Sequence, residues 1–176
     1  MGAKGMRSSR LAWLRALFAA PPLRPPGARP EREFAALCIR CGRCGAVCPY
    51  RSLVPAGWEY GSAAGTPVVI PRSVPCYLCM ECPPVCPSGA LDPITDKRAV
   101  RMGFAEVNPD TCYAFLGILC RTCVDECPLG EAALIQDGQL RPVVLEGCVG
   151  CGICEKVCPT LEPAIVVRAA TGGVRP

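Results

Sequence analysis

Residues 38–49 read C-I-R-C-G-R-C-G-A-V-C-P, and this pattern organises the whole chain. Three cysteines are separated by two residues each, a fourth follows after three more residues, and a proline comes next. The second and fourth runs repeat the spacing, and the third run differs by a seven-residue first gap. The four runs contain all 16 cysteines: Cys38, Cys41, Cys44 and Cys48; Cys76, Cys79, Cys82 and Cys86; Cys112, Cys120, Cys123 and Cys127; and Cys148, Cys151, Cys154 and Cys158.

This spacing is the ligand pattern of [4Fe–4S] clusters in bacterial ferredoxins. Three thiolates spaced by two residues can meet three corners of a cubane from one tight loop, and glycines such as Gly42 and Gly152 let the backbone approach closely. Zinc ribbons use pairs of C-x2-C, and a disulfide scaffold would not need the repeated spacing. We therefore predict that the 16 cysteines ligate the iron of four [4Fe–4S] clusters, and we assign no catalytic residue.

The composition favours a loop-rich fold held together by its metal sites. The chain has 176 residues, with 20 prolines and 18 glycines. Small apolar cores are marginal on their own, so we expect the clusters to form the core and the cluster-free chain to be largely unfolded. The absence of histidine excludes Rieske ligation and histidine acid–base chemistry. Four sites of charge 2− would take the formal charge from +4 to about −4, which does not favour nucleic-acid binding.

The four runs form an internal repeat, with first cysteines 38, 36 and 36 residues apart. We expect an α+β fold of tandem two-cluster ferredoxin-like units, with small β-hairpins and short helices around the clusters. Asp137-Gly138 between two apolar stretches predicts a hairpin, and Trp58 and Tyr60 are interpreted as core-filling or cluster-shielding residues. The predicted organisation is an N-terminal amphipathic and proline-rich segment, 1–33, a four-cluster domain, 34–168, and a disordered tail, 169–176.

The N-terminal segment has three interpretations. Residues 11–18 show a helical apolar face, but the apolar stretch is too short and too charged to span a bilayer. In the first interpretation, the segment is a frayed tail or a helix packed on a partner. In the second, it is an interfacial helix that contacts a membrane through residues 8–20. In the third, it is an export signal that lacks an Arg-Arg pair. Residues 21–26 are proline-rich and predict an extended linker. A membrane-associated location, on the cytoplasmic or the periplasmic side, is compatible with these interpretations.

Several motifs within about residues 34–168 carry a family resemblance. They are Cys38-Ile39-Arg40-Cys41-Gly42, Cys48-Pro49-Tyr50, Gly65-Thr66-Pro67, Cys86-Pro87-Ser88-Gly89-Ala90-Leu91, Gly117 before Cys120, Cys148-Val149-Gly150-Cys151-Gly152, and Cys154-Glu155-Lys156. With these motifs the chain resembles the NapG/MauM family, ferredoxin-type proteins encoded with periplasmic nitrate reductase and with methylamine utilisation. The resemblance implies four [4Fe–4S] clusters and electron transfer from a membrane quinol-oxidising partner to a terminal oxidoreductase, without independent catalysis. A maturation factor for a partner oxidoreductase is the alternative function.

Two pairings of the runs are open. In two-cluster ferredoxins the fourth cysteine of a run ligates the other cluster, so the runs work in pairs. Nested pairing would join the first run with the fourth, and sequential pairing would join the first with the second. The spacings do not decide between them, and we prefer nesting because it resembles other four-cluster electron-transfer subunits.

Overall fold

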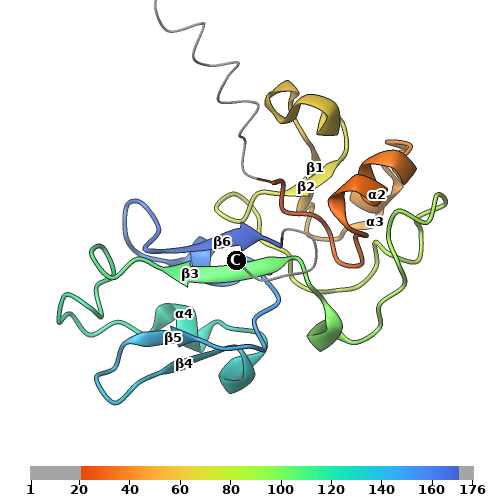
Figure 1. The fold of residues 1–176 in the computed structure, drawn as a ribbon. Helices are drawn as coiled ribbons and strands as arrows, with labels where there is room; N and C mark the ends of the chain where they lie inside the picture. The colour runs from red at the N-terminus through yellow and green to blue at the C-terminus, as the bar shows by residue number, and fades with distance from the viewer. Residues whose placement is uncertain (1–20, 171–176) are drawn as a thin grey trace, which may run out of the picture.

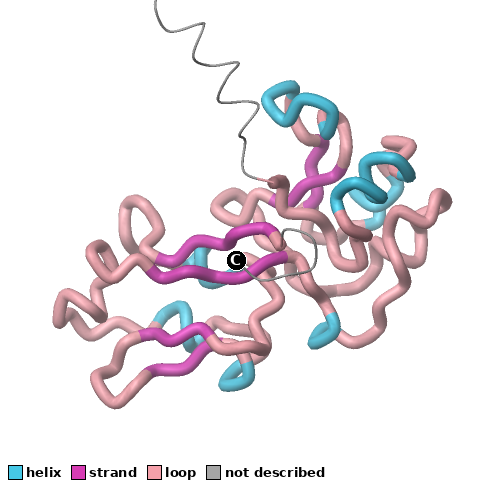
Figure 2. Tube along the Cα trace, in the orientation of Figure 1, coloured by secondary structure: helices cyan, strands magenta, loops and turns pink. Residues whose placement is uncertain are grey.

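Short helices and strands joined by long loops make up the protein (Figures 1 and 2). The computed structural model describes residues 21–170, so the predictions made for residues 8–20 lie outside the described residues. The helices are α2 (Glu31–Leu37), α3 (Arg43–Val47), α4 (Thr122–Asp125) and α5 (Ile153–Val157), with 3-10 helices η1 (Trp58–Ala63), η2 (Lys97–Ala99) and η3 (Gly130–Ala132). The strands are β1 (Leu53–Pro55), β2 (Pro67–Val69), β3 (Gly103–Val107), β4 (Leu134–Gln136), β5 (Pro142–Val144) and β6 (Ile165–Ala169).

Three antiparallel strand pairs hold the described part of the chain together. β1 pairs with β2, with Leu53 opposite Val69, and this pair lies in the first unit, formed by runs 1 and 2. β3 pairs with β6 and β4 pairs with β5 in the second unit, formed by runs 3 and 4. Figure 1 shows the β3–β6 pair stacked over the β4–β5 pair on one side of the molecule, and α2, α3 and β1–β2 on the other.

The predicted hairpin at Asp137 is confirmed by the β4–β5 pair. Its connection is longer than a two-residue turn, since Gln136 pairs with Pro142. The Asp137 carboxylate accepts hydrogen bonds from the backbone N–H groups of Gln139 (2.8 Å) and Arg141 (2.9 Å), and Leu140 has a left-handed φ of 61°. Asparagine and aspartate side chains commonly stabilise turns in this way.

The proline-rich segment is extended but does not behave as a linker, so that interpretation is wrong. Leu23 is buried, and its carbonyl accepts the Val69 N–H at 2.8 Å. Arg24 is also buried; it donates to Thr66 Oγ1 at 2.7 Å and lies 4.4 Å above the Phe34 ring. Prolines lack an N–H, so this segment enters the core with few donors left to satisfy. Residues 21–30 therefore belong to the first unit.

Two apolar clusters form the core, and cysteine side chains take part in both. The larger cluster includes Phe34, Val100 and Val149, and therefore draws residues from both units. The smaller one includes Ala105, Leu134 and Ile165 in the second unit. Trp58, by contrast, is 87% exposed, so its interpretation as a core or shielding residue is wrong. At the C-terminal end, Ala169 belongs to β6, and residues 171–176 lie outside the described residues.

Candidate metal centres

The structure gathers the 16 cysteines into four sets, each lining its own hollow. We number each set after the run that supplies three of its thiols; the fourth thiol comes from the partner run. Set 1 is Cys38, Cys41, Cys44 and Cys86; set 2 is Cys76, Cys79, Cys82 and Cys48; set 3 is Cys112, Cys120, Cys123 and Cys158; set 4 is Cys148, Cys151, Cys154 and Cys127. Within the described residues, no three His, Cys, Asp or Glu side chains form a group that could hold a single metal ion.

This grouping is sequential, and the preference for nested pairing is wrong. Cys158 lies with run 3 and not with run 1. The strand pairs give the physical reason. β1 follows run 1 and β2 precedes run 2, so their pairing joins these runs. β3 leads into run 3 and β6 follows run 4, and the pairing of Val107 with Ile165 brings the start of one beside the end of the other.

The three regularly spaced runs share an unusual backbone. In each, the residues directly before and directly after the second cysteine have left-handed φ values between 55° and 87°. A chain that alternates between right- and left-handed residues turns successive N–H groups to one side and makes an anion-binding concavity, as in many Fe–S sites. Three of the positions carry side chains, at a cost of order 1–3 kcal/mol each for the strained backbone. The residues are Arg40 and Gly42, Leu78 and Met80, and Gly150 and Gly152.

Backbone N–H groups of these loops reach cysteine sulfurs in runs 2 and 4. The Leu78 N–H bonds the Cys76 thiol, and the Ile153 N–H bonds the Cys151 thiol, each two residues on. Run 3 departs from this backbone, since Arg121 has a φ of −139°. Its widened gap carries Leu119, which is 79% exposed, while Tyr113 at the start of the gap lines the hollow of set 3.

Burial makes the cysteine-lined hollows unfavourable for uncompensated thiolates. It raises the pKa of Cys76, Cys82 and Cys123 to about 12, with smaller contributions from neighbouring thiols. Burial likewise raises the pKa of Cys151, to about 11. A buried group of thiolates needs a positive centre beside it, because burial disfavours charge and like charges repel. Four sulfur donors per hollow and inward N–H groups fit the Fe–S core, which is cationic.

Cys86 and Cys158 behave differently from the other thiols. Burial is again the largest single influence and raises the pKa, but several hydrogen bonds together outweigh it, so the pKa of both thiols is lowered. In each case the donors are a hydroxyl group two residues on and three backbone N–H groups. Sequence reasoning named Ser88 only as part of a motif and did not assign a role to the hydroxyl of Ser88 or Thr160, although their shared position after a Cys-Pro pair is visible in the sequence.

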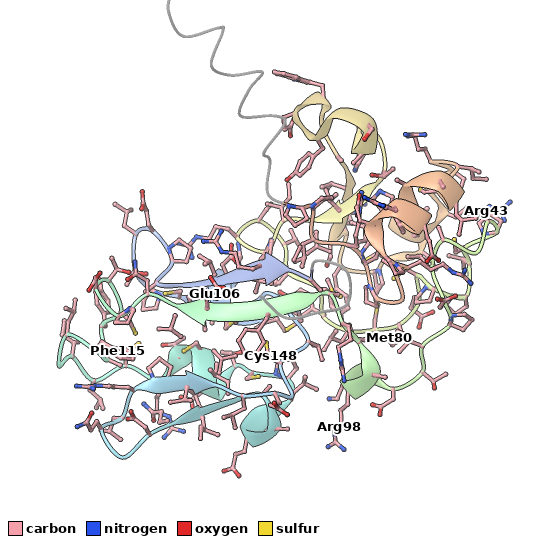
Figure 3. The ribbon with its side chains drawn as sticks, viewed as in Figure 1. Arg43, Met80, Arg98, Glu106, Phe115 and Cys148 are labelled. Carbon is pink, nitrogen blue, oxygen red and sulfur yellow. The ribbon has the colours of Figure 1, made fainter. Side chains whose placement is uncertain are left out.

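The four sets lie in a row in the order 1, 2, 4, 3. Thiols interact electrostatically between sets 1 and 2, sets 2 and 4, and sets 4 and 3. The two units meet between sets 2 and 4, where the Cys76 N–H donates to the Cys151 carbonyl at 2.9 Å. Figure 3 shows Arg43, Met80, Cys148 and Phe115, from runs 1, 2, 4 and 3, in that order across the molecule.

Arg72 ties the two units together and was not predicted. It follows β2 in the first unit, and its guanidinium donates to backbone carbonyls at the end of α5 in the second unit. Nη1 reaches Glu155 O and Cys158 O at 3.1 Å, and the Arg72 carbonyl accepts from Lys156 Nζ at 3.2 Å. A cation at a helix C-terminus is favourable, and here it also fixes the loop that bears Cys158.

Comparisons with known proteins agree with the sequential grouping. Residues 37–90 and residues 104–159 each match a family described as a 4Fe-4S dicluster domain. The chain is 42% identical over 160 residues to the ferredoxin-type protein NapG of Escherichia coli, covering 82% of this chain and 69% of the relative. It is 43% identical over 157 residues to the methylamine utilization ferredoxin-type protein MauM of Paracoccus denitrificans, covering 82% and 70%.

A more distant match is the polyferredoxin protein MvhB of Methanothermus fervidus, 34% identical over 119 residues, or 64% of this chain and 24% of that protein. No solved structure has significant similarity to the chain. Among the described residues, no helix has the length and apolar character needed to cross a membrane.

Proposed function

Because the chain belongs to the NapG/MauM family of ferredoxin-type iron–sulfur electron carriers, we propose that it holds four [4Fe–4S] clusters and relays single electrons along their row. It is an electron-transfer protein and not an independent enzyme. The observation that carries the proposal is the order of the thiol sets, 1, 2, 4, 3. The electrostatic interactions described above between thiols of different sets join only neighbours in that order.

In this proposal each set provides the four ligands of one cluster, so all 16 cysteines are iron ligands. The cluster supplies one-electron redox chemistry when it is bound. The protein's own contribution is to fix the four sulfurs, to direct N–H groups at them and to exclude water from the inner sets. Cys76, Cys82, Cys151 and Cys154 of the inner sets are all less than 10% exposed, whereas Cys41 of set 1 is exposed.

The two ends of the row are the places for redox partners. At the set 1 end, Ile39 is 64% exposed beside Cys38. At the set 3 end, Leu116 and Leu119 of the widened gap are exposed. We assign one end to a membrane quinol-oxidising protein and the other to a terminal oxidoreductase. The relatives named for methylamine utilization support a role beside a larger oxidoreductase system.

Anaerobic purification followed by a redox titration with EPR detection tests the proposal. We expect ~16 iron and ~16 sulfide per chain, as four cubane sites require, and spin coupling between neighbours. Zinc in place of iron, or half the iron, would overturn it. A turnover experiment distinguishes the relay from the alternative role in maturation. A relay is needed throughout steady-state electron flow, while a maturation factor is dispensable once its partner is active.

A further inference from the structure

The fourth cysteine of each run is followed by proline and then by a residue that differs between the outer and inner sets. In the outer sets, 1 and 3, that residue is Ser88 after Cys86 and Thr160 after Cys158. In the inner sets, 2 and 4, it is Tyr50 after Cys48 and Leu129 after Cys127. An aliphatic hydroxyl therefore stands at this position only at the two ends of the row.

The hydroxyl of Thr160 is aimed at the sulfur of Cys158. The Oγ1–Sγ distance is 3.0 Å, and Thr160 is buried, so water does not compete freely for the contact. Thr160 Oγ1 also accepts the Ala164 N–H at 3.0 Å, which leaves its own proton for the sulfur. The Ala164 N–H lies 3.3 Å from the same sulfur. Cys158 thus receives a directed hydroxyl donor in addition to backbone N–H groups.

Ser88 makes the corresponding contact in set 1, at a longer distance. Its Oγ lies 3.7 Å from Cys86 Sγ, and both residues are half-buried. The shared spacing from Cys-Pro places the two hydroxyls on the equivalent thiol of each unit. Set 3 has a further hydroxyl at the limit of contact, since Thr122 Oγ1 lies 4.0 Å from Cys120 Sγ.

We propose that Ser88 and Thr160 are positioning residues whose hydroxyl groups hold the Cys86 and Cys158 thiolates and raise the reduction potentials of the two outer clusters above those of the two inner ones. The inference rests on the proposed function, because it takes both cysteines as iron ligands. Reduction adds negative charge, so a donor to a sulfur stabilises the reduced state more than the oxidised state. The inner thiols are more deeply buried than the outer ones. Burial disfavours the more charged, reduced state, so it lowers the reduction potentials of the inner clusters and widens the same difference.

The test is a redox titration by EPR on the whole protein with all its clusters, comparing Thr160→Val and Ser88→Ala with the wild type. Thr160→Val should reduce the equilibrium constant for reduction of one cluster about tenfold, a fall of about 59 mV for a one-electron couple. Ser88→Ala should lower the potential of a different cluster by less, because its contact is longer. Thr160→Ser keeps the hydroxyl and should restore the potential. Thr122→Val is the matched control in the same set, with little or no shift expected.

The outcomes separate this inference from the function on which it rests. A wild type without four clusters overturns the proposed function. Four intact clusters with no potential lowered in Thr160→Val or Ser88→Ala overturn the inference alone, as does an equal shift in Thr122→Val. If Thr160→Val loses iron, the result with Ser88→Ala, at its half-buried position, is used instead. An unchanged reduction potential in Ser88→Ala then refutes the inference.

Discussion

Replacing Gly152 by alanine should destabilise the protein more than the same change at Gly42. The two glycines occupy the same position after the second cysteine of runs 4 and 1, and both have left-handed φ values, 87° and 74°. A Cβ at Gly152 would lie 2.5 Å from the Cβ of Pro71, in a ring that cannot swing away, whereas a Cβ at Gly42 would meet nothing within 4 Å. The pair therefore separates the cost of the backbone conformation from the cost of the contact.

The backbone term is common to both variants, about 1–2 kcal/mol for an L-residue in the left-handed region. The contact adds about 1–3 kcal/mol at Gly152 alone, as overpacking does in cores. At about 2–4 °C per kcal/mol for a protein of this size, the Gly152→Ala midpoint should fall about 2–12 °C below that of Gly42→Ala.

The assay is thermal loss of the visible cluster absorbance of anaerobic protein, with both variants heated at the same rate because cluster loss is irreversible. Iron content before heating should be unchanged in Gly42→Ala. Equal midpoints, or a lower midpoint for Gly42→Ala, would show that run 4 does not pack on Pro71 as described and would refute the reasoning.

Three further predictions test the grouping, the electrostatics and the joint between the units. Cys48→Ser should perturb the EPR signal that Cys79→Ser perturbs and leave the set 4 signal intact; perturbation of the signal that Cys151→Ser perturbs, with the Cys79 signal unchanged, would refute sequential pairing. Glu155→Ala leaves the Val167 N–H, now bonded at 2.7 Å, without its acceptor and should cost about 1–3 kcal/mol by thermal unfolding, while Glu155→Gln keeps an acceptor and costs less. Burial raises the pKa of the Glu155 carboxyl from its usual value of 4.5, so the folded wild type binds the carboxyl proton more tightly than the unfolded chain does. The wild type should therefore lose stability as pH rises above 4.5, and Glu155→Gln should lack this pH dependence. Arg72→Ala should lower the unfolding free energy by about 1 kcal/mol, and Arg72→Lys should restore little, because an ammonium cannot reproduce the planar fork; a fully restored midpoint would contradict this role.

The cysteine ligand sets were only half predictable from the sequence. In the three regularly spaced runs, three thiols lie within seven residues, and so short a loop must direct all three thiols toward one site. The partner of the fourth thiol depends on contacts far along the chain. Runs spaced by 36–38 residues allow either pairing. The pairing of β3 with β6, in which Phe104 lies opposite Arg168, decides between them, and no local sequence pattern predicts that contact.

The proline-rich segment and Trp58 show a second limit of sequence reasoning. Residues 21–26 have the composition of a linker, but Leu23 and Phe34 find apolar partners and Arg24 finds an acceptor in Thr66, so the segment folds into the first unit. Trp58 is large and apolar, yet it stands on a 3-10 helix that projects from the β1–β2 pair, with no surface to cover it among the described residues. Hydrophobic character predicts burial only where a neighbouring surface is available.

The exchange of fourth cysteines between neighbouring runs also limits how such a chain can change during evolution. Deleting one run would remove three ligands from its own cluster and one from its neighbour, so two centres would be damaged by one event. Gain or loss of the two runs of one unit, runs 1 and 2 or runs 3 and 4, leaves every remaining centre complete. The heritable module is therefore the pair, about 74 residues from the first cysteine of run 1 to that of run 3, and chains of this kind should lengthen and shorten in steps of two clusters.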